Sequence, residues 1–140
     1  MTTATRLTGE DTAAFLERFG HFEDGVITGI RLHLPRSPLA DRTATLDIQA
    51  VDVPRNAEWR LVRLTVGGVH AYRFPCSSDL SYFVLSDGLN LHCTPESAVL
   101  DLDPGPDPWT PAQVGRPGPY SAQYAAGAWC GYEVLDGPFI

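Results

Sequence analysis

The chain of 140 residues contains no lysine, and all ten of its basic residues are arginine. Seventeen aspartate and glutamate residues outweigh them and leave a formal net charge of -7. Proteins that bind phosphate backbones or anionic lipid do so through clusters of basic side chains. Because the sequence has no such cluster, we expect neither nucleic acid nor a membrane as a partner.

Long apolar runs and a targeting signal are also missing from the sequence. No run approaches the roughly 18 apolar residues that cross a bilayer, and the first residues lack the basic start and apolar core of a signal peptide. We therefore expect a cytoplasmic protein. The absence of lysine, together with abundant alanine, proline and glycine, is typical of proteins from GC-rich bacterial genomes.

Signatures of catalysis and metal binding are absent as well. The sequence has no Gly-x-Ser-x-Gly elbow, phosphate-binding loop, dinucleotide fingerprint or His-Glu-x-x-His motif. The cysteines Cys76, Cys93 and Cys130 lack metal-ligand spacing and are interpreted as small buried side chains. A thiol nucleophile formed by Cys76 with His70 or His92 is the catalytic alternative. The sequence therefore favours a protein that is not an enzyme and holds no metal and no cofactor.

The length is typical of a single domain with one core, so we expect residues 1–140 to form one domain. Its first part, residues 1–20, is a helical lead. Thr8 is placed to cap the helix, Glu10 and Asp11 fall in its first turn, and Gly20 ends it. The apolar stripe that packs this helix on a sheet consists of Phe15, Leu16 and Phe19.

Residues 21–103 follow a period of two, which predicts an antiparallel meander of strands. In residues 25–34, Ile30, Leu32 and Leu34 alternate with Gly29, Arg31 and His33, whereas residues 43–53 change phase at Ala50 and Val51, where we predict a β-bulge. Hairpins are predicted at Gly67–Gly68 and at Ser86–Gly88, because each short link joins two β-rich runs.

Six of the twelve prolines lie in residues 104–119, which excludes regular helix or central strand there. We predict that this segment crosses over the sheet. Its start, Asp101–Asp107, alternates aspartates as a calcium loop does, but Pro106 occupies the place of the turn glycine, so we interpret it as a solvated acidic turn. Residues 120–140 are aromatic-rich and contain a last strand at residues 128–135.

The sequence thus predicts an α+β fold, in which an N-terminal helix packs on a curved, mostly antiparallel sheet of 6–8 strands. Several cations fall on its strands. One interpretation is that these cations share one face of the sheet and bind a carboxylate or phosphate there. The alternative is that these cations pair with nearby carboxylates. The cations are Arg31, His33, Arg60, Arg63 and Arg73, and the carboxylates are Asp47, Asp52 and Glu58.

The most distinctive stretch is Phe19–Leu32, where the predicted helix meets the first strand. It resembles the Phe-His-Asp-small-x-Ile-x-x-Ile signature of many small bacterial proteins, among them immunity families of polymorphic toxin systems. Glu23 stands where that signature has histidine. The resemblance implies a protein-binding role. The residues that match are Phe22, Asp24, Gly25, Ile27 and Ile30.

The same stretch also makes sense as a structural corner. Phe19 and Phe22 would fill the gap between helix and sheet, and Asp24 would accept backbone N–H bonds where the chain reverses. Gly25 would supply a permissive backbone. The sequence leaves both interpretations open.

Our first hypothesis is a non-enzymatic acidic binding module, an immunity-type inhibitor of a bacterial toxin with a basic protein partner. Its candidate binding residues are Phe22, Glu23, Asp24, Arg60, Arg73 and Trp129. The alternative is a small-molecule or catalytic pocket inside the curved sheet. Its lining would be Trp59, Tyr72, Tyr82 and Trp129. A third possibility is a purely structural or oligomer-forming domain.

Overall fold

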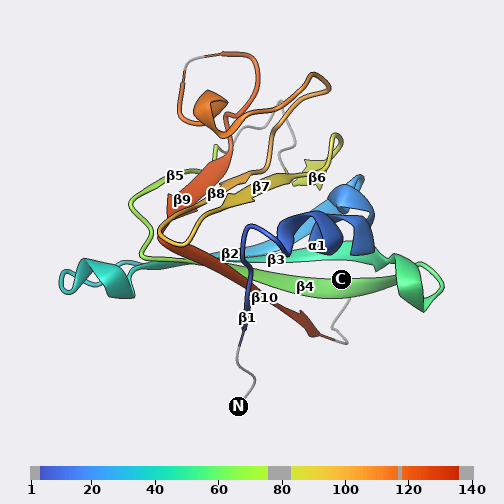
Figure 1. Cartoon of the computed structure of the whole chain (residues 1–140), viewed down its shortest axis with the longest axis horizontal. Helices are drawn as coiled ribbons and strands as arrows, with labels where there is room; N and C mark the ends of the chain where they lie inside the picture. Colours follow the sequence, from blue (N-terminus) through green and yellow to red (C-terminus); the bar gives the residue numbers. More distant parts are fainter. Residues whose placement is uncertain (1–3, 76–82, 117, 136–140) are drawn as a thin grey trace.

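The computed structural model describes residues 4–75, 83–116 and 118–135 (Figure 1). Its strands and helix are β1 (Thr5–Arg6), α1 (Thr12–Arg18), β2 (Gly25–His33), β3 (Thr43–Asp52), β4 (Glu58–Gly67), β5 (Ala71–Arg73), β6 (Val84–Leu85), β7 (Asn90–Cys93), β8 (Ala98–Asp101), β9 (Tyr124–Gly127) and β10 (Trp129–Leu135). Short 3-10 turns are η1 (Gly20–Phe22), η2 (Leu39–Asp41), η3 (Val53–Arg55) and η4 (Pro111–Gln113). No helix among these residues is long and apolar enough to span a membrane.

The strands form two antiparallel sheets. A six-stranded sheet has the order β1-β10-β4-β3-β2-β6, and a four-stranded sheet has the order β5-β9-β8-β7. The helix α1 and the second sheet lie on the same face of the first (Figure 1). The predicted antiparallel, sheet-rich fold with one helix is confirmed. The prediction of a single sheet was wrong, because the strands divide between two open sheets.

Strict alternation along the central strands creates the core. In β3 every second residue from Ala44 is fully buried, while Thr45, Asp47 and Gln49 are turned to the other face. The buried face meets apolar residues of α1 and of the second sheet in one cluster. This cluster includes Phe15, Leu16, Phe19, Phe22, Leu46, Ile48, Val62, Leu64, Leu91, Leu100, Ala125 and Cys130.

The helix carries the predicted apolar stripe, since Phe15, Leu16 and Phe19 are all buried. Its predicted start at Thr8 was wrong. The Thr8 hydroxyl donates to the Asp11 carboxylate at 2.8 Å, and the chain turns once before α1 begins at Thr12. Because the Thr8 hydroxyl and the Asp11 carboxylate bond to each other, neither side chain caps the helix. Gly20, with φ of 59°, ends it as predicted.

The bulge predicted in β3 was wrong as well. The alternation continues through Ala50 and Val51 to Asp52, and the register shift lies in β2, between Ile27 and Gly29. The pattern looked interrupted because the inward position after Ala50 holds an aspartate. Asp52 is fully buried, and a charged partner described below makes that burial possible.

Neither predicted hairpin forms. The link Gly67–Gly68 carries the chain from β4 in the first sheet to β5, which pairs with β9 in the second. The link at residues 86–88 likewise joins β6, paired with β2, to β7, paired with β8. Both glycine-containing links therefore carry the chain from the first sheet to the second.

The C-terminal strand is confirmed as β10, which pairs with β4 along its whole length. The strand β9 was missed, because Tyr124–Gly127 consists mostly of small residues without a β-rich pattern. Residues 103–116 and 118–120 form the loop beyond the ends of β8 and β9 (Figure 1).

Gly67 lies directly opposite Trp129, and a Cβ atom at Gly67 would lie 2.0 Å from the indole. We predict that Gly67→Ala lowers the free energy of unfolding by about 1–3 kcal/mol in urea denaturation, because the indole must move. Gly29→Ala is the matched control, since a Cβ there makes only ordinary contacts at 3.6 Å. Equal effects of the two substitutions would contradict the packing argument.

Candidate functional site

The chain between α1 and β2 adopts a left-handed turn. Gly20, His21 and Phe22 have φ angles of 59°, 56° and 60°, and Asp24 follows with 61°. Left-handed backbone costs a residue with a side chain roughly 1–2 kcal/mol. Such a turn persists only where its surroundings compensate for this cost.

Aromatic packing compensates on the inner side of the turn. Phe22 is fully buried, and its ring lies 5.5 Å from that of Phe15 and 5.4 Å from that of Phe19. Tyr132 of β10 completes the cluster, 4.6 Å from Phe15. The corner interpretation of Phe19 and Phe22 is thereby confirmed, and Phe22 presents no surface to a partner.

Backbone hydrogen bonds hold the outer side of the turn against the link between β6 and β7. The amide of Asp24 donates to the carbonyl of Leu85 at 2.8 Å, and the amide of Leu89 donates to the carbonyl of His21 at 3.1 Å. Only glycine fits at position 88, because a Cβ there would lie 2.2 Å from the His21 oxygen. The two segments are thus fixed against each other.

These two adjoining segments carry three exposed carboxylates, Glu23, Asp24 and Asp87, and we call this surface the acidic corner. None of the three has a cationic partner within the part of the chain that the structure describes. The corner continues toward Asp103, where burial, followed by the charges of Asp101 and Asp87, raises the pKa of the carboxyl group. Negative charge therefore extends from the helix-strand junction to the base of the proline-rich loop.

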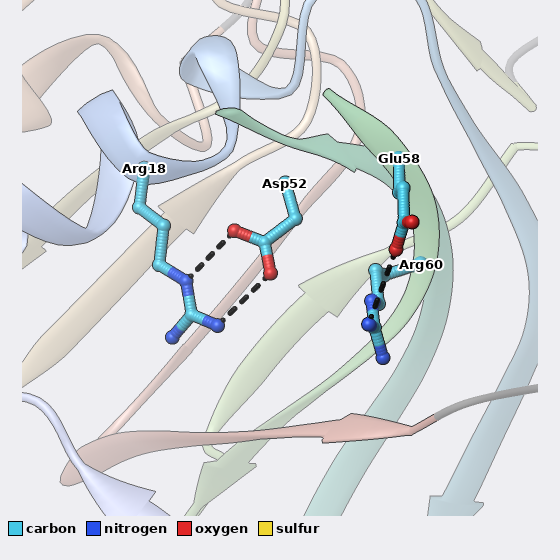
Figure 2. A network of polar contacts seen from close by, with 4 residues as sticks. All are labelled: Arg18, Asp52, Glu58 and Arg60. Atoms are coloured by element: carbon cyan, nitrogen blue, oxygen red, sulfur yellow. Dashed lines mark hydrogen bonds and ion pairs between the residues drawn. The ribbon is translucent and has the colours of Figure 1, made fainter. Parts of the chain in front are cut away.

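A partly buried ion pair lies next to the left-handed turn in the chain, between the end of α1 and the end of β3 (Figure 2). Arg18, two residues before the turn, donates from Nε and Nη2 to the two oxygens of Asp52, each at 3.1 Å. The Asp52 side chain is 0% exposed and that of Arg18 is 35% exposed. Hydrogen bonds from Arg18 lower the pKa of Asp52, against the opposing effect of burial. The pair ties the end of α1 to the end of β3.

A second pair lies beside the first in Figure 2: Arg60 contacts Glu58 at 3.3 Å. Arg60 shares the inward face with Asp52 and adds to the lowering of that pKa. Arg63, three residues later, points to the other face and donates to Asp47 at 2.7 and 3.1 Å. The arginines of β4 therefore do not form one cationic face, and the predicted pairing with neighbouring carboxylates is confirmed.

The remaining candidates lie apart from the corner. Arg73 is exposed on β5 in the second sheet. Trp129 lies across Gly67 on the face turned away from α1, and the guanidinium of Arg6 stacks on its ring at 3.8 Å. Of the candidate binding residues, only Glu23 and Asp24 are brought together at an exposed surface.

The aromatic residues proposed for a pocket do not converge. Trp59 and Tyr72 are exposed on different sheets, and neither lines the surface hollow of about 290 Å³ beside Trp129. Tyr82 and Cys76 lie outside the described residues.

Cys93 and Cys130 are buried, which confirms the interpretation of these two cysteines as small buried side chains. Burial raises the pKa of Cys93 to about 11, and burial also raises the pKa of Cys130. Thiols of this kind stay protonated at neutral pH and are poor nucleophiles. Among residues 4–75, 83–116 and 118–135, no three His, Cys, Asp or Glu side chains gather as metal ligands.

Asp101 was interpreted as part of a solvated turn, which was wrong. Its side chain is fully buried and accepts hydrogen bonds from the Trp109 indole at 2.7 Å, the Ser121 hydroxyl at 2.5 Å and the Asp103 amide at 2.8 Å. The carboxylate fastens both ends of the proline-rich loop to β8. The sequence contained one signal for the buried role of Asp101, namely the indole donor of Trp109, eight residues later.

We predict that Asp52→Asn lowers the free energy of unfolding at pH 7 by about 1–3 kcal/mol. Because the pKa of Asp52 is lower in the folded than in the unfolded chain, its contribution is present above about pH 4 and is lost as the pH falls through the folded value. The deficit of the variant should therefore shrink in acid. Urea denaturation across this pH range measures it.

Asp47→Asn is the matched control, since Asp47 also pairs bidentately with an arginine but is partly exposed to water. We expect it to cost less than about 1 kcal/mol. A deficit of the Asp52 variant that persists unchanged at about pH 2 would contradict the assignment.

Comparison with known proteins adds no relative: no family model, no curated protein and no solved structure matches the chain. The resemblance of Phe22–Ile30 to immunity families therefore stays a prediction, and function is argued from the geometry of the acidic corner.

Proposed function

We propose that this chain is a non-enzymatic protein-binding module that receives a basic partner on the acidic corner. The observation that carries the proposal is the fixed backbone beneath Glu23, Asp24 and Asp87, three exposed carboxylates that pair with no cation among the residues that the structure describes. Carboxylates in this arrangement bind guanidinium and ammonium groups through charge-assisted hydrogen bonds.

The fixed backbone matters for affinity. A flexible acidic loop would lose conformational entropy on binding, whereas a surface already held in place avoids that cost. Strained backbone also gathers at binding sites more often than elsewhere. His21, Phe22 and Asp24 keep a left-handed backbone at this corner, where glycine would adopt the same conformation at lower cost.

The charge of the whole chain supports the same partner. A net charge of -7 attracts a basic protein over long range and raises the association rate, most strongly at low salt. Arg18 and Arg63 do not weaken this field at the corner, since both are bound to carboxylates of the fold.

The resemblance of Phe22–Ile30 to immunity families narrows the proposal. A toxin with a cationic substrate site is a basic partner of the required kind, and an immunity-type inhibitor would block it with the acidic corner. Affinity of this sort falls as salt rises.

The test compares two double variants that remove the same number of charges. Glu23→Gln with Asp24→Asn neutralises the corner, and asparagine at position 24 tolerates the positive φ. Glu10→Gln with Glu96→Gln neutralises two exposed residues elsewhere. Both variants and the wild type are used as bait in lysate of a bacterium that carries the gene, at low and moderate salt.

We expect a stoichiometric basic partner that the wild type and the control variant retain and the corner variant loses by tenfold or more, roughly 1.4 kcal/mol or more of binding free energy. Equal losses for both variants would mean that only bulk charge acts. Absence of a partner at low salt would overturn the proposal.

A further inference from the structure

Strand β2 has an edge that the described strands cover only at its start. It pairs with β3 on one side, while on the other side β6 reaches only Gly25 and Val26. One more bond follows, from the Ile27 amide to the Phe83 carbonyl at 2.7 Å. From Thr28 to His33, no described segment of the chain is paired with that edge. An open edge of this kind is a template for another strand.

The same stretch exposes apolar side chains. Ile30, Leu32 and Leu34 are 37%, 38% and 41% exposed. They lie on the same face of the first sheet as Leu46 and Ala44 of β3, close to the loop with η2 that projects at the left of Figure 1. The second half of β2 therefore combines a backbone edge that no described segment pairs with and apolar side chains on one face.

We propose that two copies of this chain pair antiparallel along the open edge of β2, with Ile30 opposite Ile30 of the second copy. The two six-stranded sheets then form one continuous sheet. The proposal is independent of the partner on the acidic corner, which lies at the start of β2.

Charge and strand geometry select this register. Residues directly opposite in an antiparallel pair lie on the same face of the sheet. With Ile30 at the centre, Arg31 therefore lies over Gly29 of the second copy. Because Gly29 has no side chain, Arg31 reaches Asp47 of that copy, whose Oδ2 lies only 3.6 Å from the Cβ position of Gly29. Arg31 would there share with Arg63 a carboxylate that Arg63 already binds. Arg31 has no carboxylate partner among the described residues of its own chain.

The neighbouring registers lack this complementarity. Centring the pair on Arg31 sets two arginines opposite each other, which is destabilising. Centring it on Leu32 sets Arg31 opposite His33. Only the register centred on Ile30 gives each arginine a carboxylate, and it keeps the paired residues within 28–32, before β6 at one end and Pro35 at the other.

Sedimentation velocity over a range of concentrations tests the assembly. We expect wild type to change from monomer to dimer as its concentration rises, and Ile30→Lys to stay monomeric, because it sets two ammonium groups at the twofold axis. Val53→Lys is the matched control, since Val53 is an exposed apolar residue of η3 outside the β2 edge. A wild type that is monomeric up to about 1 mM overturns the proposal, as does a dimer that Ile30→Lys leaves intact.

Cross-linking tests the register. Opposite Cβ atoms in an antiparallel pair lie about 5 Å apart, so Ile30→Cys should form an intermolecular disulfide under mild oxidation. Leu32→Cys should link at least tenfold more slowly, because the two Leu32 positions lie four residues apart along the strands, about 13 Å. Wild type gives the background from native cysteines. Linking of both variants at the same rate, or of neither above wild type, overturns the register.

Discussion

The buried carboxylate of Asp52 and the guanidinium of Arg18 form the contact on which the rest of this structure depends. A charged carboxylate without a partner would not be stable at an inward position of a central strand. With Arg18 bound, the end of β3 is tied to the end of α1, and the chain then enters the left-handed turn beneath the acidic corner. In the described part of the chain, no fully buried side-chain nitrogen or oxygen lacks a hydrogen-bond partner.

Crossings between the sheets impose the second constraint. Gly67 marks the place where the chain leaves the first sheet, and it is also where the Trp129 indole occupies the space that a Cβ atom would need. Glycine at this position thus allows both the change of chain direction and the close packing contact with Trp129. The acidic corner depends on the other crossing, since Gly88 allows the link between β6 and β7 to approach the carbonyl of His21.

Local pattern was enough to predict most strands, because alternation such as that in residues 43–53 reflects which side chains are buried. Pairing was not predictable in the same way, since a glycine-rich link looks the same in a hairpin and in a crossing. The burial of Asp52 and Asp101 was missed because it depends on partners far away in the sequence, Arg18 at 34 positions and Ser121 at 20. The composition of the helix-strand junction was enough to predict a candidate site there. Its left-handed backbone depends on contacts from residues 85–89 that no local pattern contains.

Hydrogen exchange tests most directly whether the ion pair holds the acidic corner. The amides of Asp24 and Leu89 bridge the two segments of the corner, and the amide of His70, bonded to Ala126, reports on the second sheet. Under native conditions at neutral pH, Asp52→Asn should accelerate exchange at Asp24 and Leu89 well beyond any change at His70, because local opening replaces global unfolding. Equal acceleration at all three amides, or none at the corner, would contradict the account.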